Sequence, residues 1–201
     1  MSENVRYEVA DHVARITIDR PEKMNAMTDE MYGAMSDAIR AADTDSNVRC
    51  VIVTGAGDRA FSAGHDLLEF AGGGEWRPWR PDRFDVGLEC SKATIAAVNG
   101  YCLAGALELA LFCDIRLASE TAQFGCPEVK WAILHGYGAL RLPAMIGMSD
   151  AMRLLLSGEF IDAAEALRIG LVSEWPRQGS SCRPPTSSPN ASPPTARWRS
   201  A

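Results

Sequence analysis

The sequence lacks the features that mark membrane, secreted and nucleic-acid-binding proteins. No apolar run approaches the length needed to cross a bilayer, and the first six residues lack the basic and then apolar order of a signal peptide. The net charge is −6, and Lys and Arg form no cluster before residue 177. We therefore expect neither a nucleic-acid partner nor a membrane partner.

The sequence also lacks the paired cysteines of a disulfide framework or a structural zinc site. Its six cysteines form no Cys-x-x-Cys pair, and four of them lie in apolar runs, where cysteine usually serves as a small buried residue. We therefore expect no metal, no disulfides and a cytoplasmic location. The cysteines are Cys50, Cys90, Cys102, Cys113, Cys126 and Cys182.

The composition and the hydrophobic pattern are those of one α/β domain. The 201 residues are 47% apolar and 23% charged, which suffices for a single core. Alternation of apolar and polar residues over Arg6–Ile18 predicts two short strands, and Thr28 is expected to cap a helix. The apolar run Cys50–Thr54 suits a strand covered on both faces. The apolar stripe of the helix is Met31, Met35, Ala38 and Ile39.

One supersecondary unit occurs twice, as a strand, a glycine turn, an Ala-Gly pair and an apolar segment. Val51–Gly55 leads to Ala63-Gly64, and Ala96–Gly100 leads to Ala104-Gly105. Repetition of such a unit predicts a coil or stack rather than a simple open sheet.

Later segments predict further helices and a loop. Helices are expected near 105–112, 139–146, 151–156 and 162–169, with Ser149 or Asp150 capping the third and Gly170 ending the fourth. Residues 72–81, rich in glycine, proline and tryptophan, are expected to form a mobile surface loop, since no Lys-Ser/Thr follows the glycines to suggest a phosphate cradle.

The Ala-Gly pairs are candidates for an oxyanion hole. Each lies where a strand-loop becomes a helix, so its N–H groups point outward and the helix dipole adds positive potential there. One N–H group from each repeat, that of Ala63 and that of Gly105, could converge on a single oxygen.

Two glutamates are the candidate acid–base groups. Glu108 falls in the first turn of an otherwise apolar helix, and Glu128 follows Pro127 at the start of another turn. Each has a structural alternative, because first-turn acids are common. Together, two carboxylates in apolar surroundings suit proton transfer at a carbon next to a carbonyl.

The three histidines carry weaker signals. His65 lies beside the proposed hole and is interpreted as a polar residue packed near the site and touching ligand, rather than as a general base. His12 and His135 lie in a turn and a loop, and neither position predicts a role.

Four motifs resemble the crotonase superfamily, the enoyl-CoA hydratases and isomerases, in order and spacing. They cover about Val5 to Trp175, and the resemblance implies a spiral of ββα units, in agreement with the repeat. The motifs are Arg20-Pro21-Glu22-Lys23-Met24-Asn25-Ala26-Met27, Ala60-Phe61-Ser62-Ala63-Gly64-His65-Asp66-Leu67, Ala96-Ala97-Val98-Asn99-Gly100-Tyr101 and Gln123-Phe124-Gly125-Cys126-Pro127-Glu128.

The resemblance implies an acyl-CoA substrate, whose thioester oxygen the Ala63 and Gly105 N–H groups hold. It implies that Glu108 activates water for attack at C3 and that Glu128 supplies the proton at C2. It requires no metal and no cofactor beyond the coenzyme A of the substrate. Because isomerases often keep one of the two glutamates, we expect an enoyl-CoA hydratase. The implied substrate and CoA contacts are Lys23, Met24, Ala26, Gly64, His65, Asp66, Leu67, Tyr101 and Pro127.

Three departures from the family pattern affect the acyl site. Ala104-Gly105-Ala106 replaces a more usual run of three glycines, and the segment 68–91 looks short. His135-Gly136-Tyr137-Gly138 stands where relatives more often have Pro-Gly-x-Gly-Gly.

The composition changes after Pro176. Residues 1–176 are predicted to form the crotonase-like core. Residues 177–201, which are rich in Ser, Pro and Arg, are predicted to form a disordered tail. A shifted frame through this stretch can encode an amphipathic helix, so we expect a frameshift, with a genuine tail as the alternative. The C-terminal helices that build the family's homotrimer or dimer of trimers are then missing or scrambled, which is expected to weaken that assembly.

Three functions remain open at this point. The first is hydration of a trans-2-enoyl-CoA. The second is an enoyl-CoA isomerase or another crotonase-fold acyl-CoA lyase. The third is an inactive, truncated product that binds acyl-CoA weakly or aggregates through an exposed apolar face.

Overall fold

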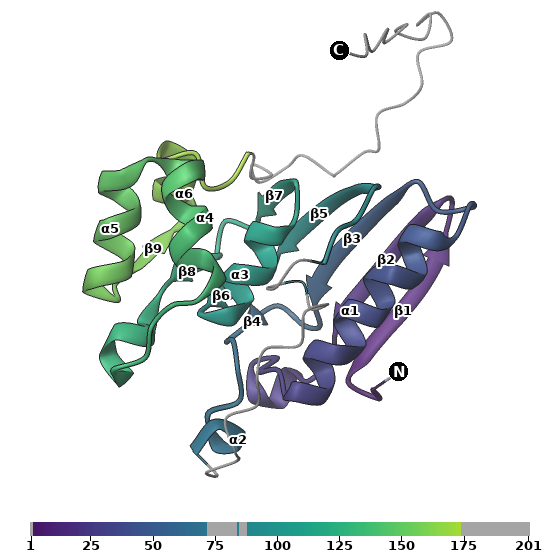
Figure 1. Cartoon of the computed structure of the whole chain (residues 1–201), viewed down its shortest axis with the longest axis horizontal. Coiled ribbons are helices and arrows are strands. Elements are labelled where there is room, and N and C mark those ends of the chain that lie inside the picture. Colours follow the sequence, from purple (N-terminus) through teal and green to yellow (C-terminus); the bar gives the residue numbers. More distant parts are fainter. Residues whose placement is uncertain (1, 72–83, 85–87, 174–201) are drawn as a thin grey trace, which may run out of the picture.

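The computed structural model describes residues 2–71, 84 and 88–173, which form two sheets with helices packed on them (Figure 1). The larger sheet has the strand order β1-β2-β3-β5-β7 and the smaller has the order β4-β6-β8-β9. The β1–β2 and β8–β9 pairs are antiparallel, and the other pairs are parallel. The strands are β1 (Val5–Ala10), β2 (Val13–Ile18), β3 (Cys50–Gly55), β4 (Ala60–Ser62), β5 (Ala93–Val98), β6 (Tyr101–Leu103), β7 (Ile115–Ala118), β8 (Gln123–Gly125) and β9 (Phe160–Asp162).

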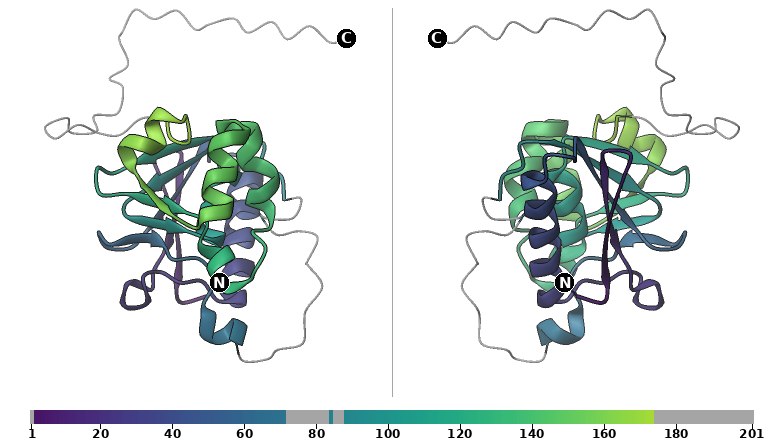
Figure 2. Two further views of the ribbon diagram at one scale, coloured as in Figure 1. Left: turned by 90° about the vertical axis from the view of Figure 1, so that its left-hand side faces the viewer. Right: turned by 90° about the vertical axis from the view of Figure 1, so that its right-hand side faces the viewer.

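The helices gather mainly on one side of the strands, where Figure 2 shows α1 together with α4 and α5. No helix in the described ranges has both the length and the apolar character needed to cross a membrane. The helices are α1 (Asp29–Thr44), α2 (Leu67–Ala71), α3 (Gly105–Phe112), α4 (Tyr137–Ile146), α5 (Met148–Ser157) and α6 (Ala163–Arg168), with the short 3-10 helices η1 (Pro21–Lys23) and η2 (Pro127–Trp131).

The chain winds as a spiral because successive strands alternate between the two sheets. β3, β5 and β7 lie in the larger sheet, and each is followed by a strand of the smaller one, β4, β6 or β8. Each coil then continues into a helix, α2, α3 or η2. The predicted coil and the α/β class are confirmed, and the structure adds a third coil that the sequence pattern did not reveal.

Two glycines make the tight bends of the first two coils. A Cβ on Gly55 would lie 2.3 Å from the carbonyl oxygen of Phe61, and one on Gly100 would lie 2.2 Å from that of Arg59. Only glycine fits so close to another backbone. The bend of the third coil, 119–122, contains no glycine, which is why the repeat was not recognised there.

Helix α1 forms as the sequence predicts. The Thr28 side chain accepts a hydrogen bond from the N–H of Met31 at 3.3 Å, and the predicted stripe is fully buried. The prediction that the strand at 50–54, now β3, is covered on both faces was partly wrong. Val51 and Val53 are buried, but Ile52 and Thr54 are half-buried, because the second face of this sheet is less covered.

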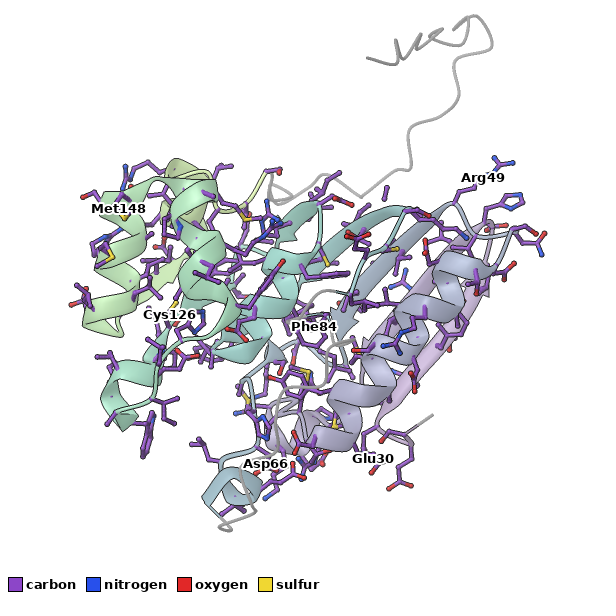
Figure 3. All side chains as sticks on the ribbon, in the orientation of Figure 1. Glu30, Arg49, Asp66, Phe84, Cys126 and Met148 are labelled. Atoms are coloured by element: carbon purple, nitrogen blue, oxygen red, sulfur yellow. The ribbon has the colours of Figure 1, made fainter. Side chains whose placement is uncertain are left out.

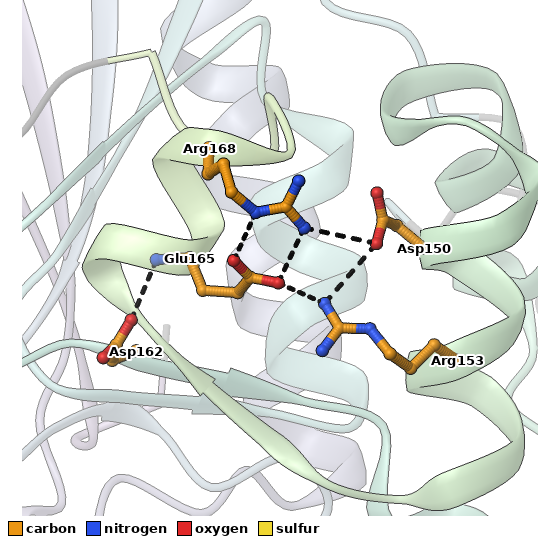
Figure 4. A network of polar contacts seen from close by, with 5 residues as sticks. All are labelled: Asp150, Arg153, Asp162, Glu165 and Arg168. Atoms are coloured by element: carbon orange, nitrogen blue, oxygen red, sulfur yellow. Dashed lines mark hydrogen bonds and ion pairs between the residues drawn. The ribbon is translucent and has the colours of Figure 1, made fainter.

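The C-terminal helices contain one wrong prediction. α5 starts after Gly147, which has a φ of 83°, and neither Ser149 nor Asp150 caps it with a side chain. Asp150 instead joins an exposed ion-pair network with Arg153, Glu165 and Arg168 (Figure 4). Hydrogen bonds from Arg168 and Arg153 lower the pKa of Glu165 to about 2, against a smaller opposing effect of desolvation.

Helix α6 has the predicted boundaries to within one residue. The Asp162 side chain accepts from the N–H of Glu165 at 2.8 Å, and Gly170, with a φ of 79°, follows its end. The predicted loop 72–81, the domain boundary at 176 and the tail 177–201 lie outside the described residues.

Candidate active site

The first two coils meet where their Ala-Gly pairs approach one another. A Cβ on Gly64 would lie 2.8 Å from the Ala104 Cβ and 3.2 Å from the Gly105 nitrogen. Ala104 itself has a φ of 54° and a ψ of −129°, a conformation that costs an L-residue about 1–3 kcal/mol. The two Ala-Gly pairs are therefore neighbours in the structure.

The Ala63 N–H, predicted as one oxyanion donor, is engaged within the chain. It donates to the Met24 carbonyl at 3.0 Å. The β4–β6 register shifts between Ala60 and Ser62 and then pairs Ser62 with Cys102. Beyond that pair, Gly64 lies against Ala104 and Gly105, and His65 follows Gly64 directly.

Gly105 begins α3 as predicted. Because it is the first residue of the helix, its N–H has no acceptor within the helix and lies at the positive end of the helix dipole. A Cβ at this position would lie 2.1 Å from the hydroxyl oxygen of Tyr32, which is 2% exposed. Sequence analysis missed Tyr32, because it lies on α1 and nothing in its spacing links it to residue 105.

Glu108 is a buried acid in the first turn of an otherwise apolar helix. It is 7% exposed, and its Oε1 accepts a hydrogen bond from the Gly138 N–H at 3.1 Å. The neighbouring residues 106, 107 and 109–111 of α3 are all buried. Burial of the carboxylate is therefore imposed by the helix that carries it.

Glu128 lies in the first turn of η2, directly after Pro127. Its Oε1 is 2.5 Å from Nδ1 of His135. Its Oε2 is buried and has no hydrogen-bond partner among the described residues. An unpaired buried oxygen is costly, which makes this atom a candidate to bind a group from outside the chain.

His135, to which the sequence assigned no role, contacts Glu128. It is 4% exposed, and its Nε2 lies 3.7 Å from the Cys126 sulfur, near the end of β8 where Figure 3 labels Cys126. Burial by itself lowers the pKa of His135, but the hydrogen bonds with Cys126 and Glu128 outweigh it and raise the pKa to about 10. The available signal was a lone histidine seven residues after Glu128, in a position that departs from the family pattern.

The two glutamates belong to one connected cluster. Gly138 donates its N–H to Glu108, and a Cβ on Gly138 would lie 2.0 Å from Nε2 of His135, which in turn binds Glu128. The chain thus brings two carboxylates together beside the start of α3. Such an arrangement can hold a water molecule and move protons at a carbon next to a carbonyl.

The predicted CoA segments are held against each other. The Met27 N–H donates to the Gly64 carbonyl at 2.8 Å, and Arg20 Nη1 lies 2.7 Å from Asp66 Oδ2. The fully buried Asn25 donates to the carbonyls of Ala56 and Ala60. Sequence analysis did not assign Arg20 or Asn25 a role, although both lie in a family motif.

Of the predicted CoA residues in these two segments, Gly64 is buried and the others are at least partly exposed. Lys23 is exposed, Met24 and Ala26 are half-buried, and Met24 borders a hollow lined also by Pro21, Asn25 and residues 56–60. Leu67 begins α2 and is 49% exposed.

His65 and Tyr101 make different contacts. The His65 ring stacks on Tyr32 at 5.3 Å, and its Nε2 lies 3.8 Å from Glu69, so this side chain is close to the Gly105 region. The Tyr101 ring packs against Phe160 of β9 at 6.3 Å. The structure therefore brings His65, but not the Tyr101 ring, to the Tyr32–Gly105 contact.

Comparisons with known proteins agree with this architecture. The profile of a family described as enoyl-CoA hydratase/isomerase matches residues 8–178. The (E)-benzylidenesuccinyl-CoA hydratase of Thauera aromatica is 41% identical over 177 residues, covering 85% of this chain and 68% of that protein. The short-chain-enoyl-CoA hydratase of Clostridium acetobutylicum is 41% identical over 180 residues, with the same coverage. The structure of an enoyl-CoA hydratase from Mycobacterium tuberculosis H37Rv matches with a TM-score of 0.81 at 38% identity, covering 89% of this chain and 71% of that one.

The spiral fold and the pair of carboxylates, one buried and one half-buried, define an α/β enzyme of the crotonase type. The chain belongs to the enoyl-CoA hydratase/isomerase family. The resemblance stated from the sequence, and the fold that it implied, are thereby confirmed.

Proposed function

We propose that this chain catalyses the reversible addition of water across the C2=C3 double bond of a trans-2-enoyl-CoA. The observation that carries the proposal is the connected cluster in which Gly138 and His135 join Glu108 to Glu128. Hydration requires a water held at C3 and a proton delivered to C2, and two positioned carboxylates supply both. The relatives named as enoyl-CoA hydratases support the same reaction.

Each glutamate has one role in the proposed reaction. Glu108 holds the water and accepts a proton from it while the water oxygen bonds to C3. Glu128 gives a proton from Oε2 to C2 in the same addition. Return of the proton from Glu108 to Glu128 through solvent restores the starting state. Each positioned acid or base contributes about 10²- to 10⁴-fold in rate.

The thioester oxygen is held by backbone N–H groups from the first two coils. Gly105 supplies one, at the start of α3, and we propose His65, which follows Gly64 where the two coils meet, as the donor of the first coil. Negative charge that develops on this oxygen during addition is stabilised by both groups and by the helix dipole. Removal of one such donor typically costs about 10²- to 10³-fold in rate.

We place coenzyme A along the surface formed by the segments 23–26 and 63–67, with the Lys23 ammonium available to a phosphate group. The steps above move only water and protons, so the proposal includes no metal and no redox cofactor. The five described cysteines are free thiols, which suits a cytoplasmic location.

We also propose that copies of the chain associate as the family's homotrimer or dimer of trimers, an assembly that the 177–201 tail is expected to weaken. Leu134 and Leu140 are 86% and 81% exposed, near the glutamate cluster on the segment 133–146. Side chains of this kind are commonly covered in an assembly. Size-exclusion chromatography with light scattering tests this proposal, and a monomer at micromolar concentration would contradict it.

Product analysis separates hydration from its rivals. The purified chain is incubated with crotonyl-CoA and, separately, with a 3-enoyl-CoA. Formation of 3-hydroxybutyryl-CoA from the first supports hydration. Migration of the double bond in the second without hydration of the first would instead establish an isomerase. Failure of a soluble, folded chain to act on either would favour the non-catalytic product.

A further inference from the structure

His135 binds one oxygen of Glu128 and leaves the other to the site. Its Nδ1 lies 2.5 Å from Oε1, and both side chains are largely buried, at 3% and 13% exposure. Oε2 of the same carboxylate is buried without a hydrogen-bond partner among the described residues. The two oxygens of Glu128 are therefore in different environments, and His135 makes the difference.

We propose that His135 is a positioning residue that directs Oε2 of Glu128 towards substrate and stabilises the carboxylate formed when Oε2 gives up its proton. This inference rests on the proposed proton transfer between Glu128 and C2. It goes beyond the family resemblance, which assigns His135 no role.

The proton transfer balances within the cluster. Before addition, Glu128 carries a proton on Oε2, and the imidazolium of His135 donates Nδ1–H to Oε1. The Oε2–H bond breaks, its electron pair stays on Oε2, and the proton forms the new C2–H bond. The resulting carboxylate remains bound to the imidazolium. In the reverse reaction, Oε2 takes the proton from C2.

Cys126 and Gly138 lie beside the His135 ring, in addition to Glu128. Cys126 approaches Nε2 from the end of β8, and Gly138, whose N–H donates to Glu108 of α3, lies against the ring. On α4, the Arg141 guanidinium lies over the Tyr137 ring. The raised pKa of His135, about 10, agrees with an imidazolium that persists through neutral pH.

The first test compares His135→Asn and His135→Leu with the unchanged chain. Asn keeps an N–H donor near the Nδ1 position without the charge, and Leu removes both. Loss of a charge-assisted hydrogen bond of this kind lowers a rate by about 10- to 100-fold. The kcat of His135→Leu should therefore fall by that factor, and the kcat of His135→Asn should fall by less. KM should change little. His12→Asn, at the exposed turn between β1 and β2, is the matched control and should leave kcat unchanged.

The pH profile gives a readout that lost packing would not move. A raised pKa means that His135 is charged below about pH 10 and loses its charge above it. The kcat of the unchanged chain should fall through this range, and the fall should be absent in His135→Asn. Wild-type kcat in His135→Leu, or an unaltered alkaline limb in His135→Asn, would overturn the inference.

Deuterium exchange at C2 of butyryl-CoA separates this inference from the proposed function, because the exchange needs Glu128 and no water addition. Exchange that His135→Leu slows about 10- to 100-fold supports the role of His135 even if crotonyl-CoA is not hydrated. If the chain hydrates crotonyl-CoA but neither His135 variant changes the exchange rate, the proposed function stands and the inference is overturned. Absence of both activities from the folded chain would overturn both.

Discussion

The carboxylate of Glu108 accepts a hydrogen bond at 3.1 Å from the N–H of Gly138, thirty residues further along the chain. Glu108 lies in the first turn of α3, and Gly138 is the second residue of α4, so the positive ends of two helices meet at one acid. The residue before α4 is Gly136, which has no side chain to cap it. Glu108 therefore serves the start of α4 as well as the proposed site.

Gly138→Ala should disrupt this cluster. The added Cβ would lie 2.0 Å from His135 Nε2, so either the imidazole or the start of α4 must move. We expect a loss of about 1–3 kcal/mol in unfolding free energy and a fall in kcat of at least about tenfold. Urea unfolding and crotonyl-CoA hydration measure the two effects.

Gly33→Ala is the matched control for this substitution. A Cβ there meets nothing within 4 Å, and the residue lies inside α1. It should stabilise the chain by about 0.5–1 kcal/mol and leave kcat unchanged. Equal behaviour of the two alanine variants would contradict the proposed contact between Gly138 and His135.

Gly105→Ala and Tyr32→Phe should compensate each other. The new Cβ would lie 2.1 Å from the Tyr32 hydroxyl oxygen but 3.3 Å from its Cζ, so removal of the hydroxyl relieves most of the overlap. We expect Gly105→Ala alone to lose about 1–3 kcal/mol of stability and the double variant to regain most of it. Thermal unfolding of the four-member cycle measures this coupling, and simple additivity would show that the two residues do not touch.

The Arg20–Asp66 ion pair should stabilise the chain in a pH-dependent way. The hydrogen bond from Arg20, with one from the Leu68 N–H, lowers the pKa of Asp66. A lowered folded-state pKa gives stability that is present above the unfolded value, about 3.9, and is lost as pH falls through the folded value. Asp66→Asn should therefore cost about 1–3 kcal/mol at neutral pH and progressively less in acid.

Urea unfolding at neutral pH and at about pH 3 tests this prediction. Asp37→Asn is the control, because Asp37 makes an exposed pair with Arg40 at the surface of α1, and it should change stability little at either pH. A cost of Asp66→Asn that stays constant as pH falls would show that the ion pair is not its source.

The sequence was sufficient for features that depend on local pattern. The β1–β2 hairpin, the Thr28 cap and the boundaries of α3 follow from alternation, capping chemistry and the glycine at a helix start. The burial of Glu108 followed from the apolar helix around it. The family followed from four motifs whose order and spacing are specific.

Features that depend on contacts across the chain were not predictable. The Tyr32 hydroxyl meets Gly105 from another helix, and His135 meets Glu128 after the chain has turned through η2. The hydrogen bond from the Ala63 N–H to the Met24 carbonyl joins two segments that are far apart in the sequence, and no local pattern indicated it. Which face of β3 is covered depended on the side on which the helices gather.

The central claim is that Glu108 and Glu128 together perform the hydration. The most direct measurement is kcat for crotonyl-CoA hydration, followed by the loss of enoyl-thioester absorbance, in Glu108→Gln, Glu128→Gln and the double variant. Glu8→Gln, exposed on β1, is the control. Each single variant should lose about 10²- to 10⁴-fold in kcat, the double variant should lose less than the product of the two, and the control should be unaffected. Hydration that persists at the wild-type rate in either single variant would contradict it.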